Sequence, residues 1–155
     1  MPVRILFVGH DSRDPFIILG KSYLSRSARI LSPKVEEVKE SKRKPKSNLS
    51  AVESEEAQLL LEKSKGCYRI ALDENGKQLS SLQFAKKLEQ NLSRGKEVAF
   101  LIGGATGLSP ALLKECDETW SLSALTFPHR IAFLLLSEQI YRAGEILRGG
   151  PYHKV

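Results

Sequence analysis

Two loops rich in glycine and serine, together with an aromatic and basic chain end, are the parts of this sequence best suited to chemistry. The first loop covers residues 103–107 (Gly-Gly-Ala-Thr-Gly), the second covers residues 121–127 (Ser-Leu-Ser-Ala-Leu-Thr-Phe), and each follows a short apolar segment. The chain closes with Tyr152, His153 and Lys154 before a final valine. Because glycines let a backbone approach a ligand closely, the pattern predicts a small-molecule site built from backbone groups, with a reactive tail beside it.

The loop at residues 103–107 does not match the known phosphate-binding loops. It lacks the Gly-Lys-Ser/Thr ending of a nucleoside-triphosphate loop. A dinucleotide loop requires glycine where Ala105 stands, and it normally follows the first strand of its domain. The alternative is a tight turn between a strand and a helix that needs a positive φ.

The three histidines lie on separate segments, and no cysteine or carboxylate stands at metal-ligand spacing to them, so no metal site is predicted. His10, Asp11 and Ser12 have the residue types of a catalytic triad, but adjacency in sequence is not triad geometry. His129 follows a proline at a helix start, which favours a structural histidine over a catalyst.

The length of 155 residues predicts one domain over residues 1–155, and the excess of 24 Lys and Arg over 18 acidic residues favours an anionic partner such as nucleic acid. The most biased stretch, residues 39–46, holds five basic residues, one acid and a proline. Its composition is typical of a solvated loop. Contact with phosphates through Lys42, Arg43 and Lys44 is compatible with that interpretation.

The two cysteines, Cys67 and Cys116, are far apart and predict reduced, half-buried thiols. The N-terminal apolar run is too short for a signal peptide, and the apolar run at residues 131–136 is too short to cross a bilayer. We therefore expect a cytoplasmic protein.

Apolar runs alternate along the chain with segments of helical periodicity. Helix starts are marked by Asp14-Pro15, by capping boxes at Ser50 and Ser80, by Ser109-Pro110 and by Pro128. A turn is expected at residues 73–76. Strands are predicted at Arg4–Val8, Lys34–Val38, Tyr68–Leu72, Val98–Ile102 and Thr119–Leu122.

This alternation indicates an α/β fold in which helices cover both faces of a parallel sheet. Ligands of such sheets bind beyond the carboxyl ends of the strands. Leu72, Gly103, Gly104 and the segment Leu122 to Phe127 should therefore share one edge.

The last predicted helix, residues 129–147, is apolar nearly all round in its first half. A helix that is apolar on every side must be buried on every side, and one sheet face cannot do this. A second subunit is the simplest cover, so a homodimer is expected. Glu138 and Arg142, at i and i+4, are interpreted as an ordinary helix pair.

Five segments in order resemble the bacterial large-subunit rRNA pseudouridine methyltransferase H family of the SPOUT, or α/β-knot, superfamily. The match is dense from residue 68 onward and weaker but colinear before it. The segments are Leu72-Asp73 with Gly76-Lys77, Ile102-Gly103-Gly104 with Gly107-Leu108, Leu125-Thr126-Phe127-Pro128-His129, Glu138-Gln139-Ile140-Tyr141-Arg142-Ala143 and Tyr152-His153-Lys154.

The resemblance implies a homodimer with a trefoil knot at about residues 68–155. It implies S-adenosylmethionine as methyl donor and, as acceptor, N3 of pseudouridine 1915 in 23S rRNA. The assembled ribosome is the expected substrate, and free rRNA and the large subunit stay open as alternatives. Its implied donor contacts are Leu72, Gly103, Gly104, Leu122, Ser123, Ala124, Leu125, Thr126 and Phe127.

The resemblance also places the tail beside the acceptor base. His153 is the candidate base or orienting group, because imidazole titrates near neutrality. Tyr152 could stack on the base, and Lys154 could hold a phosphate. The alternative from the residues alone is a frayed chain end.

Two positions depart from the family pattern. His10 stands where a basic residue is common, and Phe133 stands where an arginine is often found. Arg130, one turn earlier on the same helix face, is the candidate replacement for that arginine. Arg130 and Arg142 therefore join Lys42, Arg43 and Lys44 as expected RNA contacts.

Two rival functions remain open at this point. A related knotted methyltransferase acting on tRNA would use the same donor site. A basic ribosome-binding factor that kept the fold without catalysis would bind no donor.

Overall fold

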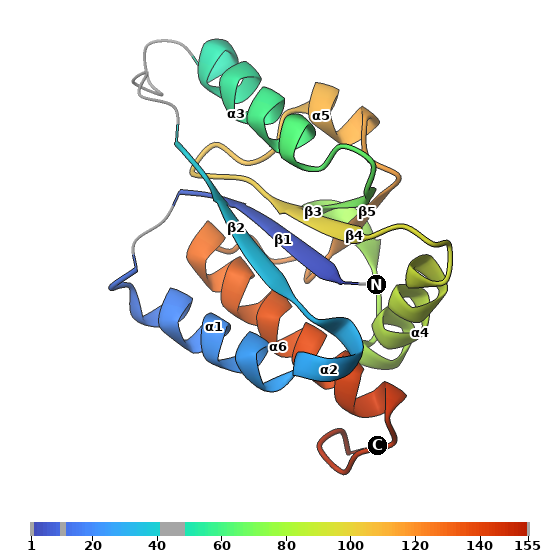
Figure 1. The fold of residues 1–155 in the computed structure, drawn as a ribbon. Coiled ribbons are helices and arrows are strands. Elements are labelled where there is room, and N and C mark those ends of the chain that lie inside the picture. The colour runs from blue at the N-terminus through green and yellow to red at the C-terminus, as the bar shows by residue number, and fades with distance from the viewer. Residues whose placement is uncertain (1, 10–11, 41–48, 155) are drawn as a thin grey trace.

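The computed structural model describes residues 2–9, 12–40 and 49–154 (Figure 1). Within these residues five strands form one sheet, and helices occupy the connections. The strands are β1 (Val3–Val8), β2 (Lys34–Val38), β3 (Tyr68–Gln78), β4 (Val98–Ile102) and β5 (Glu118–Ser121). The helices are α1 (Pro15–Arg26), α2 (Ala28–Leu31), α3 (Leu49–Lys63), α4 (Ser81–Leu92), α5 (Pro110–Lys114) and α6 (His129–Leu147).

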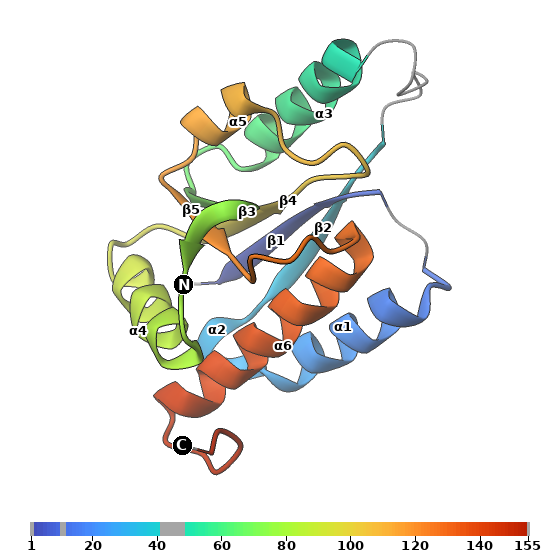
Figure 2. The ribbon, with the colours of Figure 1, turned by 180° about the vertical axis from the view of Figure 1, so that it is seen from behind.

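The sheet has the strand order β2-β1-β4-β3-β5, and every pairing is parallel. Parallel neighbours need crossover connections, which place helices over the faces of the sheet. Helices α1, α4 and α6 cover one face, and α3 and α5 cover the other (Figures 1 and 2). The predicted α/β sandwich is confirmed.

Most predicted helix starts are confirmed with their capping bonds. The Asp14 carboxylate accepts from Phe16 N at 2.8 Å, and a proline follows it as the first residue of α1. Ser80 and Gln83 form the predicted capping box of α4. These bonds satisfy backbone N–H groups that have no partner within the helix.

Two local predictions are wrong. The turn expected at residues 73–76 is an irregularity inside β3, which continues to Gln78. Both Leu72 and Lys77 pair with Trp120 of β5, so the extra residues bulge out of the ladder. Helix α3 begins at Leu49, which puts Ser50 in its first turn rather than at its cap.

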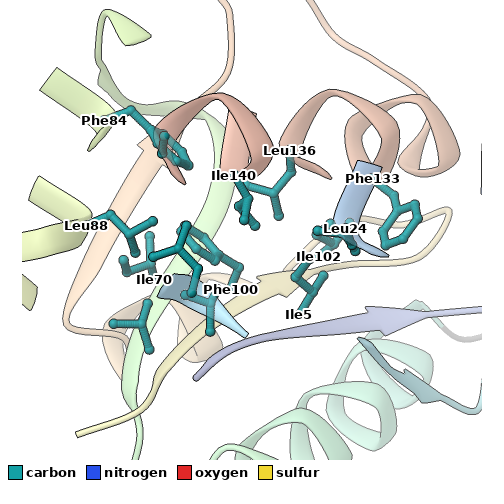
Figure 3. Close-up of a cluster of buried hydrophobic side chains, with 14 of the residues drawn as sticks. Ile5, Leu24, Ile70, Phe84, Leu88, Phe100, Ile102, Phe133, Leu136 and Ile140 are labelled. Carbon is teal, nitrogen blue, oxygen red and sulfur yellow. The ribbon is translucent and has the colours of Figure 1, made fainter. Parts of the chain in front are cut away.

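The larger core lies between the sheet and the helices α1, α4 and α6. Phe133, Leu136 and Ile140 of α6 belong to this core together with Phe100 and Ile102 of β4 (Figure 3). These five side chains are at most 3% exposed. The smaller core lies on the opposite face, under α3 and α5.

As expected, one sheet face does not cover α6 alone, but much of its further cover comes from the same chain rather than from a second subunit. The helix is flanked by α1 on one side and α4 on the other, so its own chain covers most of its first half. Leu135, at 36% exposure, is its most exposed large apolar side chain. A larger exposed apolar surface lies on α1, where Phe16, Ile18 and Leu19 are 38%, 53% and 52% exposed.

Cys67 and Cys116 are free and half-buried, as predicted, and both pack at the edge of the smaller core. Burial raises the pKa of Cys116 to about 11, which keeps it a thiol at neutral pH. None of the described helices is long and apolar enough to cross a bilayer.

Candidate functional site

A cavity of about 580 Å³ opens at the carboxyl ends of β4 and β5, beside the bulge of β3. Three segments line it: residues 72–74 at the bulge of β3, residues 102–108 after β4, and the connection from β5 into α6. The structure thus brings together the residues that the sequence assigned to one edge. The predicted donor contacts that line the cavity are Leu72, Gly103, Gly104, Leu122, Ser123, Leu125, Thr126 and Phe127, whereas Ala124 does not.

The glycine loop owes its shape to a close approach between its two ends. A Cβ on Gly103 would lie 2.6 Å from the carbonyl carbon of Gly107. Gly107 has a φ of +74° and donates its N–H to the Gly104 carbonyl at 3.0 Å. Glycine at position 103 is therefore required by the backbone of the loop itself, and the predicted positive φ falls at Gly107.

The loop after β5 is held by its own serines and by β3. Ser121 Oγ donates to the Ser123 carbonyl at 2.7 Å, and Ser123 Oγ accepts from Leu125 N at 3.1 Å. Thr126 Oγ1 donates to a carboxylate oxygen of Glu74. These bonds leave the Leu125 side chain 69% exposed at the mouth of the cavity.

The chemistry of the lining fits the donor that the resemblance implies. Thr106 Oγ1 is buried without a hydrogen-bond partner among the described residues, as expected where a ligand supplies the partner. Asp73 and Glu74 bring carboxylates that suit a cationic sulfonium and an amino group. Leu72 and Phe127 add apolar surface suited to an adenine ring. The cavity volume lies in the range of small-molecule sites.

His129 lines this cavity but has the environment of a structural histidine. Its ring centroid lies 5.4 Å from that of Phe7. Burial, the largest cause, lowers its pKa, so the ring is neutral at physiological pH. This agrees with the structural interpretation of His129.

Arg130, in the first turn of α6, forms an ion pair with the capping residue of α1. Its Nη1 lies 2.5 Å from Asp14 Oδ2, and its side chain is 50% exposed. Burial alone would raise the pKa of Asp14, but bonds from Arg130 and from two backbone N–H groups lower it. Phe133, at the family's arginine position, is fully buried against Phe7 and Gly20. An extended arginine does not fit there.

The C-terminal tail folds back onto α6 in a hydrogen-bonded network. Glu138 Oε1 accepts from Arg142 Nη2 at 2.6 Å and from the Tyr152 hydroxyl at 3.0 Å. Arg142 Nη1 lies 3.1 Å from His153 Nδ1. The pair Glu138–Arg142 is thus more than the predicted helix pair, because it also holds two tail residues. Lys154 is exposed.

Tyr152 is held in its protonated form by this network. The pKa of Tyr152 is raised to about 12, mainly by burial and next by its hydrogen bond to Glu138. Its ring also contacts Tyr141, at 4.8 Å between centroids, and lies under the Arg142 guanidinium at 4.7 Å. At neutral pH the Tyr152 hydroxyl therefore donates to Glu138.

The cavity and the tail lie at opposite ends of α6. His129 lines the cavity, and the tail follows Leu147, 19 residues along the helix. At 1.5 Å per residue the helix ends are roughly 27 Å apart. The tail folds back to Glu138 and Arg142, which lie roughly 14–20 Å along the helix from His129. Figure 2 shows the C-terminus beyond the far end of α6. Within one chain the predicted catalytic residues do not reach the predicted donor contacts.

Some expected residues lie outside the part of the chain that the structure describes. These are Lys42, Arg43 and Lys44 in the basic loop, and His10. Among the described residues no group of three or more His, Cys, Asp or Glu is arranged to hold a metal ion.

Sequence reasoning missed three polar residues of the cavity: Asp73, Glu74 and Thr106. Asp73 and Glu74 come directly after the predicted end of a strand, which is a usable signal. They were assigned to a turn, and their place on the cavity wall depends on the bulge of β3. Nothing in the sequence marks Thr106 as unpartnered.

Comparison with known proteins agrees with this geometry. The family model described as a predicted SPOUT methyltransferase matches residues 1–153. The "Ribosomal RNA large subunit methyltransferase H" of Methylobacillus flagellatus is 38% identical over 99% of both chains. That of Anaeromyxobacter sp. strain K is 39% identical over 99% of this chain and all of its own.

A solved structure, a probable methylase family protein from Haemophilus influenzae, shares the fold with a TM-score of 0.59. It is 13% identical, and the match covers 99% of this chain and 70% of the other. The chain belongs to the ribosomal RNA large subunit methyltransferase H family of SPOUT methyltransferases, and its methyl donor is S-adenosylmethionine.

Proposed function

We propose that this protein methylates N3 of pseudouridine 1915 in 23S rRNA, with the assembled ribosome as its substrate. The observation that carries the proposal is the cavity at the strand ends, with its unpartnered Thr106 hydroxyl and its two acidic residues. The names of the full-length relatives support an rRNA of the large subunit over a tRNA as acceptor.

In the proposed site the loops after β4 and β5 bind the donor. Backbone groups around Gly104 and Ser123 would hold its polar ends, and Thr106 Oγ1 would gain the partner it lacks. Asp73 and Glu74 would stabilise the positive charges of the donor. These contacts fix the direction of the methyl group, and such orientation is worth roughly 7–11 kcal/mol of the barrier.

The active form is proposed to be a homodimer in which each cavity receives the tail of the partner subunit. The separation supports this, because the tail residues contact Glu138 and Arg142, roughly 14–20 Å along α6 from His129 in the cavity. The exposed apolar side chains of α1 and Leu135 of α6 are the proposed contact surface. A symmetric pair would use the same surface twice and form two identical sites.

We infer further that residues 68–155 contain the trefoil knot of the family. Contacts between distant segments support this inference. Thr126 Oγ1 donates to Glu74 across 52 positions, and a Cβ on Gly76 would lie 2.7 Å from the Thr119 carbonyl oxygen. β5 and the segment that follows it therefore pack against the bulge of β3.

The reaction forms a bond between N3 and the methyl carbon as the bond from that carbon to sulfur breaks. When bound, S-adenosylmethionine supplies the methyl group on a sulfonium that makes it electrophilic. The electron pair of the broken bond stays on sulfur, and the N3 proton leaves to solvent. The protein must orient the base and stabilise negative charge on its imide.

His153 is suited to that second task. An arginine side chain only donates, so the contact from Arg142 Nη1 makes Nδ1 of His153 the acceptor. The neutral ring then carries its proton on Nε2. We propose that this Nε2–H donates to a carbonyl oxygen next to N3, which supports the orienting role of His153 over the role of base.

RNA contact is proposed for Arg130, Arg142, Lys154 and the basic loop with Lys42, Arg43 and Lys44. The exposed side of the Arg130 guanidinium, fixed by Asp14, supports its part. Arg142 is occupied by Glu138 and His153, so its effect on RNA would act mainly through the position of the tail.

The proposal is tested by methyl transfer from labelled S-adenosylmethionine to ribosomes, isolated large subunits, protein-free 23S rRNA and tRNA. Mass spectrometry of the nucleosides identifies the product. We expect N3-methylpseudouridine, at one position, and on ribosomes. A methylated tRNA nucleoside would instead support the tRNA enzyme. Absence of donor binding at high micromolar concentration would support the non-catalytic factor.

A further inference from the structure

A second cavity, of about 360 Å³, lies where the end of α1 and the short α2 meet the second half of α6. In Figure 1 these three elements lie together near the C-terminus. Three arginines line the cavity: Arg26, Arg29 and Arg148. One carboxylate, that of Glu145, also lines the cavity, so its wall has a net charge of +2. The cavity therefore suits an anion.

Arg26 lies over a pair of neighbouring tyrosine rings, Tyr23 and Tyr141, whose centroids are 5.8 Å apart. Its guanidinium carbon lies 4.7 Å from the ring centroid of Tyr23 and 5.3 Å from that of Tyr141. Its Nε donates to the Ser22 carbonyl at 3.4 Å. No carboxylate of the described residues pairs with its terminal nitrogens. The cation–π contacts restrict the position of the guanidinium and leave its terminal nitrogens to donate.

Arg29 and Arg148 supply the other two positive charges of the cavity wall. Arg29 is exposed, and among the described residues it has no ion-pair partner. Arg148 pairs with Glu145, whose Oε1 accepts from Nη2 at 2.9 Å. The side chain of Arg148 remains 54% exposed. Among the described residues that line the cavity, Glu145 is the carboxylate with which an incoming anion would compete.

The chemistry of the wall favours phosphate groups of single-stranded RNA. Guanidinium forks match phosphate oxygens in pairs, and aromatic or guanidinium planes stack on unpaired bases. The volume exceeds what one phosphate needs and leaves room for the attached sugar. The cavity lies next to the C-terminal tail, because the Tyr141 ring beside Arg26 also contacts Tyr152.

We propose that Arg26, Arg29 and Arg148 bind the phosphodiester backbone of the substrate RNA, next to the nucleotide whose base meets the tail. This inference rests on the proposed function. It gives a protein without a separate RNA-binding domain a way to hold the strand beside the reacting base.

The test uses the full-length protein with Arg26→Gln and Arg29→Gln combined, and with Arg148→Gln alone. Arg94→Gln is the matched control, since Arg94 also lies over a tyrosine ring, at 5.1 Å from the centroid of Tyr68, far from the tail. Binding to protein-free 23S rRNA and to ribosomes is measured over a range of salt. Circular dichroism and calorimetry check the fold and donor binding.

We expect the double variant to bind both RNA substrates on the order of tenfold more weakly, as befits the loss of hydrogen bonds to a charged group. The slope of log K against log salt should fall in magnitude by about 0.7 for each phosphate that the variant no longer neutralises. KM for ribosomes should rise with kcat retained, and donor affinity should not change. Arg26→Lys should keep part of the salt dependence, because lysine keeps the positive charge. It should recover little of the RNA affinity, because lysine lacks the planar guanidinium that binds two phosphate oxygens at once.

Unchanged RNA affinity and salt slope in a folded, active double variant would overturn the inference and leave the proposed function intact. A loss confined to ribosomes would overturn it in favour of an acidic ribosomal protein. Dissociation into monomers would assign the cavity to the subunit interface. A wild-type protein that binds donor and methylates no rRNA would instead refute the proposed function, while RNA binding still tests the cavity.

Discussion

Arg142 and His153 are joined by a contact of 3.1 Å between Nη1 and Nδ1, and this contact decides which ring nitrogen of the histidine faces outward as a donor. Arg142 is itself held by two bonds to Glu138, at 3.0 Å and 2.6 Å. The tail is thus ordered by α6 before any substrate arrives. Order of this kind reduces the entropy lost when the reacting groups are aligned.

The orienting role of His153 can be separated from the role of base by two substitutions. Glutamine can place an amide N–H near the position of Nε2 but cannot take up a proton at neutral pH. We expect His153→Gln to keep single-turnover methyl transfer within about tenfold of wild type, while His153→Ala loses more. If His153 is the base, both variants should fall together by about 10²–10⁴-fold. Donor binding is measured separately and should be normal in both.

A shared active site predicts complementation between two inactive variants. Ala132→Phe should fill the donor cavity, which Ala132 lines, and truncation after Gly150 removes the tail. Mixing equal amounts of the two should restore about one quarter of wild-type activity, because half the dimers are mixed and each has one intact site. Ala132→Ser serves as the control for the first variant. No recovery in a mixture that sedimentation shows to contain mixed dimers would contradict the shared site.

The unpartnered hydroxyl of Thr106 predicts that its removal lowers the affinity for the donor without lowering the stability of the fold. Thr106→Val removes the buried oxygen and keeps the shape, so the apo protein should be as stable as wild type or slightly more so. Affinity for S-adenosylmethionine should fall on the order of tenfold. Thr106→Ser keeps the hydroxyl and should stay near wild type. Calorimetry measures both quantities, and a valine variant with full affinity would remove Thr106 from the donor site.

Glu118, at the start of β5, predicts a loss of stability in acid. Burial alone would raise its pKa, but bonds from Trp120, Lys87, Tyr68 and Asn91 lower it to about 2. A carboxyl with a lowered pKa stabilises the fold above its unfolded value, here the ordinary 4.5, and this contribution is lost as the pH falls toward 2.

Glu118→Gln should therefore lower the free energy of unfolding by about 2 kcal/mol at neutral pH and reduce its dependence on pH between 5 and 2. The expected fall in Tm is roughly 4–8 °C. Glu89→Gln, an exposed glutamate of α4, is the control and should change neither quantity. Equal acid sensitivity in wild type and Glu118→Gln would show that other carboxyls govern the transition.

The sequence by itself determined the class of fold and the edge of the sheet at which the cavity lies. Apolar runs such as Val98–Ile102, alternating with capped helices, require a buried parallel sheet, because only such a sheet covers strands on both faces. Its connections bring the loops at residues 103–107 and 121–127 to one edge. Local signals at Asp14 and Ser80 were sufficient because capping bonds form between residues two or three positions apart.

Tertiary structure decided what depends on distant neighbours. The burial of α6 follows from its place between α1 and α4, which no periodicity within the helix reveals. The bulge that brings Asp73 and Glu74 to the cavity exists because Leu72 and Lys77 share one partner on β5. The separation of His153 from Gly103 depends on the length and direction of α6, and it places the tail beside Tyr141 and Arg26 rather than beside its own cavity.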